Sequence, residues 1–105
     1  MKLKNKLGKR IQELRLSYNL KQSELAEKVG IATKTQSCIE TGKNYPSAEL
    51  IERYSQAFNV DVADVLNISH IKNDEEILQD IQELLKTVDS DDLFLIYKII
   101  KSVLR

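Results

Sequence analysis

The stretch that decides the fold runs from Gln22 to Ile39 and reads QSELAEKVGIATKTQSCI. It predicts two short helices that cross closely and are joined by a turn. Such a pair needs a small fifth residue where the helices cross and a ninth residue that tolerates the turn, and these are Ala26 and Gly30. The joint match is specific, although any one position alone would carry no signal. The apolar residues that the pair needs at its fourth, eighth, tenth and eighteenth positions are also present: Leu25, Val29, Ile31 and Ile39.

Helical periodicity continues on both sides of this pair. Apolar residues at spacings of four, three and four predict a helix over about residues 6–18. Gly30 and Gly42 are expected to end the two helices of the pair, because glycine adopts a positive φ at little cost. Thr33 is expected to cap the second of them and Ser47 a fourth helix, which a short fifth helix follows. The front of the chain therefore predicts five short helices.

The last third of the chain has a different character. Residues 67–73 are expected to form a linker, and residues 74–105 a helical hairpin whose first helix is capped by Asp74. The second helix is expected from about Asp91, and nine of the twelve residues in 93–104 are apolar or Tyr. A helix that is apolar nearly all round must be covered on more than one side. We therefore expect the hairpin to mediate dimerisation, with docking onto the chain's own first domain as the alternative. The stripe predicted for the dimer interface consists of Leu93, Ile96, Tyr97, Ile100, Val103 and Leu104.

The composition is typical of a soluble all-α chain. Its 105 residues are 42% hydrophobic and 30% charged, which suits one small domain with an appendage. Three Gly and one Pro provide little material for the turns of a β-sandwich or barrel. No apolar run approaches the roughly 20 residues that cross a bilayer, and the start lacks the apolar stretch of a signal peptide. We therefore expect a cytoplasmic protein without a membrane partner.

The charge is balanced overall but unevenly distributed. Sixteen Lys and Arg oppose sixteen Asp and Glu. Residues 1–45 hold ten bases against four acids, a net charge of +6, whereas residues 46–66 and 67–105 each carry a net charge of −3. A basic front with an acidic rear favours one face for contact with phosphate, although charged faces are most often only solvated.

Four stretches together resemble a known family. They read LGKRI at 7–11, QSELAEKVGI at 22–31, IETGK at 39–43 and FNVDV at 58–62. With them the chain resembles the phage-repressor type of helix-turn-helix protein, also called the XRE family, over residues 6–66. The resemblance implies a compact five-helix domain that binds duplex DNA, usually as a symmetric homodimer that regulates transcription. It does not extend to the C-terminal hairpin.

The resemblance also implies roles for individual residues. In this family the third helix enters the major groove, where each base pair shows a distinct pattern of donors and acceptors. The positions that match its base-reading residues are Thr33, Lys34 and Cys38. The positions that match phosphate contacts are Gln22, Thr41, Lys43, Asn44 and Arg10, with Ser37 open to either role. Arg15 and Glu40 match a structural ion pair that bridges the first and third helices, so we do not assign Arg15 to DNA.

Two residues depart from the family pattern. Gln36 occupies the fifteenth position of the pair, which is normally apolar. Its amide must find partners or reach the rim of the core, because an unpaired buried amide costs roughly 1–3 kcal/mol. Cys38 replaces what is often a long polar side chain. A thiol switch is one interpretation of Cys38, and a small tolerated residue is the favoured one.

Enzymatic chemistry finds no support in the sequence. Gly8, Gly30 and Gly42 are scattered, so they form no loop that could cradle a phosphate. The single Cys38 excludes an internal disulfide, and with the single His70 it falls short of a zinc set or of a catalytic group. We therefore expect no enzyme, no cofactor and no metal.

Charge, motif and resemblance together predict a transcriptional regulator, with repression favoured, that binds a near-palindromic operator as a homodimer. Two alternatives stay open. One is the antitoxin of a toxin–antitoxin pair that regulates its own promoter, and the other is an interaction adaptor whose helix-turn-helix no longer binds DNA. The expected partners are double-stranded DNA and a second copy of the chain, and a further protein partner is left open.

Overall fold

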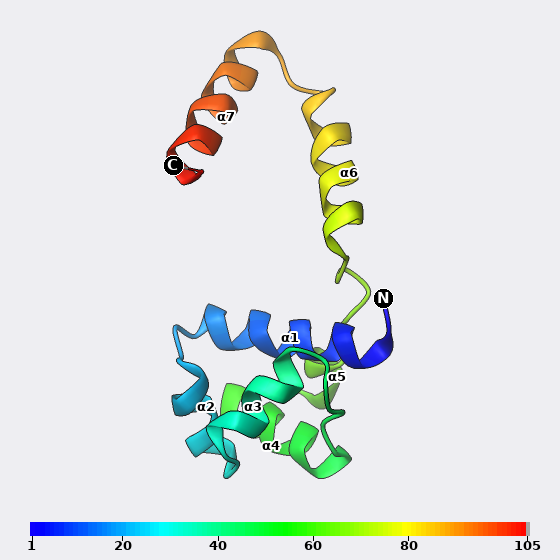
Figure 1. The fold of residues 1–105 in the computed structure, drawn as a ribbon, viewed down its shortest axis with the longest axis vertical. Coiled ribbons are helices and arrows are strands. Elements are labelled where there is room, and N and C mark those ends of the chain that lie inside the picture. Colours follow the sequence, from blue (N-terminus) through cyan, green and yellow to red (C-terminus); the bar gives the residue numbers. More distant parts are fainter. Residues whose placement is uncertain (105) are drawn as a thin grey trace. The chain divides into compact units, whose positions relative to one another are not determined.

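The computed structural model describes residues 1–104, and every regular element among them is a helix (Figure 1). The all-α prediction is therefore confirmed. The chain divides into two compact units, Met1–Ile71 and the part from Lys72 onward. The final residue of the predicted hairpin lies outside the described residues. The helices of the first unit are α1 (Leu3–Ser17), α2 (Gln22–Val29), α3 (Thr33–Glu40), α4 (Ala48–Phe58) and α5 (Val62–Val65). Those of the second are α6 (Asp74–Leu85) and α7 (Ser90–Val103).

The core of the first unit lies where its five helices meet. Helix α3 packs against α1 and α2, while α4 packs against α2 and α5. Burying one large apolar side chain contributes about 1.5–3 kcal/mol, so the apolar side chains buried in this core supply most of the stability of the unit. The large apolar side chains that are at most 2% exposed are Ile11, Leu25, Ile39, Tyr54, Phe58 and Val65.

Two glycines shape the close approaches of this unit. Gly30 ends α2 in the left-handed region, with a φ of 77°, as predicted. Gly8 was not assigned a structural role from the sequence, yet α1 approaches the end of α3 at this point. A Cβ on Gly8 would lie 2.3 Å from the carbonyl oxygen of Ile39 and 2.7 Å from that of Glu40, so no larger residue fits without moving a helix.

The helix caps agree with the sequence in part. Ser47 caps α4, because its hydroxyl accepts the N–H of Leu50 at 3.1 Å. Thr33 does not cap α3 but is its first residue, following Ala32. The cap of α6 is Asn73 rather than Asp74, since its side-chain oxygen accepts the N–H of Glu76 at 2.9 Å. This shift leaves the three acids of residues 74–76 in the first turn, where their negative charge interacts favourably with the helix dipole.

The segment after α5, up to Ile71, belongs to the first unit and contacts α1. Ile71 is 9% exposed, and Nε2 of His70 lies 2.8 Å from the carboxylate of Glu13 on α1. Burial raises the pKa of Glu13, but hydrogen bonds with His70 and Arg10 outweigh this effect and the pKa is lowered below its ordinary value. His70, within the stretch 67–73 expected as a linker, thus contacts α1 directly.

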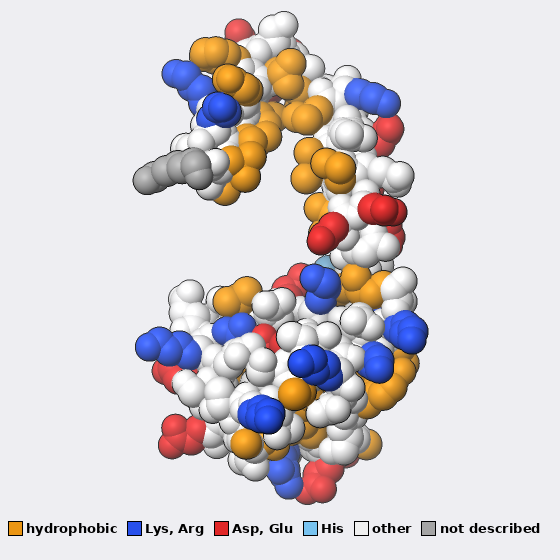
Figure 2. All heavy atoms as spheres, viewed as in Figure 1, with side chains coloured by type: hydrophobic (Ala, Val, Ile, Leu, Met, Phe, Trp, Pro, Cys, Tyr) orange, Lys and Arg blue, Asp and Glu red, His pale blue; other side chains and the backbone are white. Residues whose placement is uncertain are grey.

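The second unit buries none of its described residues. Neither α6 nor α7 has a buried residue, and hydrophobic side chains gather along both (Figure 2). Asp89 caps α7 by accepting the N–H of Asp92 at 2.9 Å, so this helix begins one residue earlier than Asp91. None of the helices formed by residues 1–104 is long and apolar enough to span a bilayer. Of the stripe predicted for dimerisation, Ile96 is half-buried and the others are 38–75% exposed: Leu93, Tyr97, Ile100, Val103 and Leu104.

Candidate nucleic-acid interface

Helix α3 presents one polar face outward and buries the other. Residues three and four apart lie on the same side of a helix, so the outward face gathers four neighbouring positions. Thr33 and Lys34 are exposed on it, while Ser37 and Cys38 one turn later are half-buried. The structure therefore brings the three predicted base-reading residues and Ser37 onto a single stripe. The opposite face consists of Gln36, Ile39 and Glu40, which are all buried.

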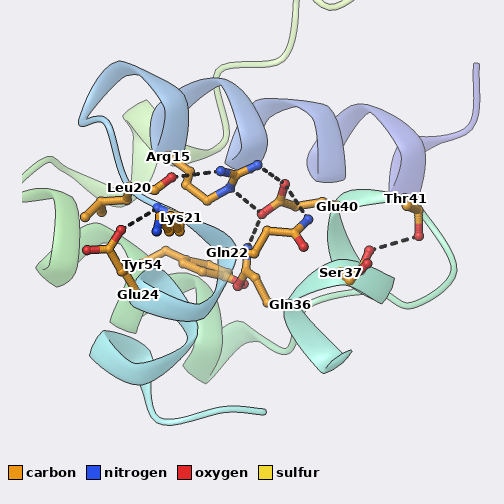
Figure 3. Close-up of polar contacts among 10 residues, drawn as sticks. All are labelled: Arg15, Leu20, Lys21, Gln22, Glu24, Gln36, Ser37, Glu40, Thr41 and Tyr54. Atoms are coloured by element: carbon orange, nitrogen blue, oxygen red, sulfur yellow. Dashed lines mark hydrogen bonds and ion pairs between the residues drawn. The ribbon is translucent and has the colours of Figure 1, made fainter. Parts of the chain in front are cut away.

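A buried ion pair holds the end of α3 to α1. The guanidinium of Arg15 donates from Nε to one carboxylate oxygen of Glu40 at 2.8 Å and from Nη2 to the other at 2.9 Å (Figure 3). Its Nη1 donates to the carbonyl of Leu20 at 2.8 Å. The side chains of the pair are only 10% and 2% exposed. Arg15 is therefore occupied inside the domain, in the geometry of the structural pair that the family resemblance implied.

The amide of Gln36 finds two partners in the core. Gln36 is fully buried, and its Nε2 donates to Glu40 at 2.7 Å while its Oε1 accepts the hydroxyl of Tyr54 at 2.6 Å. Burial, and then the charge of Glu40, raise the pKa of Tyr54, so this hydroxyl stays a donor. Among the described residues no buried side-chain nitrogen or oxygen lacks a partner. The departure from the family pattern is thus compensated by a residue of α4.

Gln22 lies at the junction of this buried network and the surface. It opens α2 and is half-buried, and its Nε2 lies 3.3 Å from the carboxylate of Glu40. The residue before it, Lys21, provides no side-chain cap for α2. The first turn of the helix therefore keeps N–H groups that could meet a phosphate oxygen.

A surface depression adjoins Gln22. Its walls come from the amino-terminal half of α1, the start of α2 and the end of α3. The α1 residues here carried no predicted role, although their spacing of four and three already indicated one helix face. The lining consists of Met1, Asn5, Lys9, Gln12, Gln22, Glu40 and Thr41.

The other predicted phosphate contacts fall into two groups. Lys43 and Asn44 are exposed in the turn after α3, and Thr41 is exposed while its hydroxyl donates to the carbonyl of Ser37 at 2.9 Å. Arg10 differs, because its side chain is only 13% exposed and binds the carbonyl of Asp64 from Nε at 3.0 Å and Nη2 at 2.7 Å. It also pairs with Glu13. Arg10 therefore ties α1 to α5, and its contact with phosphate stays a prediction.

Comparison with known proteins agrees with this geometry. The sequence profile described as Helix-turn-helix matches residues 11–65. The chain belongs to this family. Within it, the chain is of the phage-repressor, or XRE, type, as the sequence resemblance indicated.

Named relatives of this helix-turn-helix protein include regulators and an antitoxin. The cryptic phage CTXphi transcriptional repressor RstR of Vibrio cholerae is 27% identical over 83% of this chain and 80% of its own length. The antitoxin PezA of Streptococcus pneumoniae is 37% identical over 67% of this chain and 44% of its own length. Among solved structures, the clp gene regulator ClgR of Corynebacterium glutamicum is similar with a TM-score of 0.63 and 29% identity, over 82% of this chain and 88% of that one.

Proposed function

We propose that this helix-turn-helix protein is a sequence-specific transcriptional regulator, a repressor, that binds a near-palindromic operator as a homodimer. The observation that carries the proposal is the stripe of Thr33, Lys34 and Cys38 on a helix whose other face is locked in the core. A rigid helix with a polar outer face is what the major groove accepts.

The chemistry of the stripe suits base edges. The ammonium of Lys34 can donate to O6 and N7 of guanine, and the hydroxyl and methyl of Thr33 can bond a base or touch a thymine methyl. Cys38 offers a small, weakly polar contact. Lys34 is the residue on which discrimination between sequences depends most.

Phosphate contacts would frame this stripe on both sides. Gln22 with the free first turn of α2 serves one side, and Thr41, Lys43 and Asn44 serve the other. Lys9 joins the first group, because it lines the same depression as Gln22. Lys and Arg side chains spread over the face of the first unit shown in Figure 2. Such contacts position the protein without reading sequence.

The second unit supports dimerisation. Successive residues of an α-helix are turned by 100° around its axis. On α7 the apolar side chains fill an arc that begins at Leu95, passes Ile99 and ends at Tyr97, which is more than half of the circumference. No residue of α6 or α7 is buried in the single chain, so these faces lack cover. A second copy would cover both helices and give the dimer two copies of α3 for two half-sites, about one helical turn of DNA or a multiple of it apart.

Selection of bound duplexes from a random pool tests this proposal. We expect enrichment of a near-palindromic sequence, and binding that weakens steeply with salt because phosphate contacts release counterions. Lys34→Ala should relax the choice of bases at one position of each half-site by about 1–3 kcal/mol. Lys86→Ala, which removes an equal charge from the second unit, should leave that choice unchanged. Absence of duplex binding even at low salt would favour the adaptor without DNA binding.

The antitoxin function is the second candidate, and the similarity to PezA favours it. This chain spans less than half of PezA. In an antitoxin the exposed faces of α6 and α7 would bind a toxin rather than a second copy. Co-purification of a small partner enzyme in fixed ratio with the chain would support this function, and a homodimer free of any partner would support the regulator.

A further inference from the structure

Three helices converge on two neighbouring side chains of α3. Gln36 and Glu40 lie one turn apart on its buried face, and Figure 3 shows the donors that reach them. Arg15 comes from α1, Gln22 from α2 and Tyr54 from α4, so each of these helices bonds α3 through a side chain.

The buried face of α3 is mostly polar. Of its three buried side chains only Ile39 is apolar, and the first buried one is Gln36, because Thr33 and Lys34 are exposed and Thr35 is half-buried. The amino-terminal half of α3 therefore enters the core through the amide of Gln36. Glu40 and Arg15 fix only the other end of the helix.

Hydrogen bonds specify orientation in a way that apolar contacts do not. The hydrophobic effect has no direction, whereas a hydrogen bond weakens steeply as its angle falls below about 120°. A side-chain tip lies about 5–6 Å from the helix axis, so rotating α3 by about 20° would move that tip by about 2 Å. Such a shift would break a hydrogen bond to a base, whose length is about 2.7–3.2 Å.

We infer that the Gln36–Tyr54 hydrogen bond is a positioning device that sets the rotation of α3, and thereby which bases Thr33 and Lys34 reach. Gln36 and Tyr54 contact no base and act through the helix. The inference rests on the proposed function and adds to it two residues that determine specificity from inside the domain. An apolar residue at position 36 would fill the same space without fixing the angle.

The test removes both polar ends together. Either single change would leave a buried oxygen or hydroxyl unpaired, whereas replacing both partners with apolar groups is nearly neutral for stability. Gln36→Leu also removes one donor from Glu40, but that carboxylate keeps the donors of Arg15 and Gln22. We therefore expect Gln36→Leu with Tyr54→Phe to melt close to the unaltered chain. Its affinity for random duplex and the salt dependence of that affinity should also persist, because the phosphate contacts are unchanged. Its preference for the selected operator over a scrambled duplex should fall about tenfold or more, as expected for one lost base contact.

A matched control uses the exposed tyrosine. Tyr45→Phe makes the same chemical change at a side chain that is 60% exposed, and it should leave the preference unchanged. A double variant that melts normally and keeps full preference for the operator would overturn the inference. So would a preference that Tyr45→Phe reduces equally.

A measurement on the free protein separates this inference from the proposed function. Residual dipolar couplings report the orientation of the α3 backbone relative to α1 without any DNA. We expect the double variant to change that orientation or to broaden it, and the Tyr45→Phe variant to preserve it. Unchanged couplings in the double variant would overturn the positioning role. If the unaltered chain binds no duplex while the couplings of the double variant shift, the proposed function fails and the positioning of α3 stands.

Discussion

The two units of this chain show what amphipathic helices do with and without enough partners. In the first unit, α4 buries Tyr54 and Phe58 completely. Helices α2 and α5 pack against α4, and α1 and α3 complete the same core. In the second unit, α7 is richer in apolar residues but buries none of them. The apolar periodicity that forms a helix is thus present in both units. What differs is the number of neighbouring helices that can cover the apolar face. Periodicity therefore predicts the helix, while the burial of its apolar face depends on which other segments of the chain can cover it.

The largest expected difference concerns the two phenylalanines. Phe58 is 0% exposed in the first unit and Phe94 is 61% exposed in the second. Phe58→Ala should lower the free energy of unfolding by about 3–5 kcal/mol, because it leaves a cavity. Phe94→Ala should change it by about 0.5–1 kcal/mol, the value of its contact with Lys98. Urea denaturation followed by circular dichroism measures both, and equal losses would contradict the contrast between the units.

The next contrast compares a buried ion pair with an exposed one. Glu40→Ala strands Arg15 and removes the acceptor of Gln36, so we expect a loss of about 3–5 kcal/mol in the free energy of unfolding. Glu83→Ala breaks an exposed pair with Lys86 in α6 and should change that free energy by less than about 1 kcal/mol. Chemical denaturation of the two variants side by side gives the difference. A small loss for Glu40→Ala would mean that the pair adds little to the seating of α3.

The third contrast separates assembly from the stability of the first unit. Charged residues at Ile96 and Ile100 should give monomers that bind an operator poorly, because a charge in an apolar interface is costly to desolvate. The melting of the first unit should stay unchanged, since these residues lie in α7. Sedimentation measures the first effect and calorimetry the second. A chain that is monomeric at high concentration before any substitution would refute the proposed dimer.

The smallest effect concerns the surface link between α1 and the segment after α5. The pKa of Glu13 is lowered in the folded chain, so its ionised form stabilises the fold at pH values above the ordinary carboxylate pKa. That contribution disappears as the pH falls below this ordinary value and through the lowered pKa. Glu13→Gln should therefore flatten the acid side of a plot of unfolding free energy against pH. Because Glu13 is 44% exposed, solvent weakens the effect, and Glu27→Gln on the exposed face of α2 is the matched control.

Much of the first unit could be predicted from local signals. The six positions of the crossing pair specified α2 and α3, and Ser47 marked the start of α4, because these rules depend on neighbours within a few residues. Two cap positions differ from the prediction. Asn73 rather than Asp74 caps α6, since adjacent polar residues compete for the same cap, whereas α3 begins at Thr33 after Ala32, which has no side chain that could cap it.

The residues of the candidate site were also predicted unevenly. The family resemblance implied the stripe of Thr33, Lys34 and Cys38, and the structure places these residues on one face of α3. Arg10 carried only a predicted phosphate contact, while the structure shows its bond to the carbonyl of Asp64, 54 residues away. No local pattern reveals a backbone carbonyl at that distance in sequence.

By itself the sequence determined the helices and their order, because short-range spacing and turn chemistry encode them, and its resemblance to a known family implied the outward stripe of α3. Only the tertiary structure decided how Gln36 is satisfied, why Gly8 admits no side chain and where Arg10 is used. Each of these depends on an atom from a distant helix: the Tyr54 hydroxyl, the Ile39 carbonyl and the Asp64 carbonyl. Directional bonds and close contacts between remote segments exist only once the chain has packed, so a linear pattern cannot contain them.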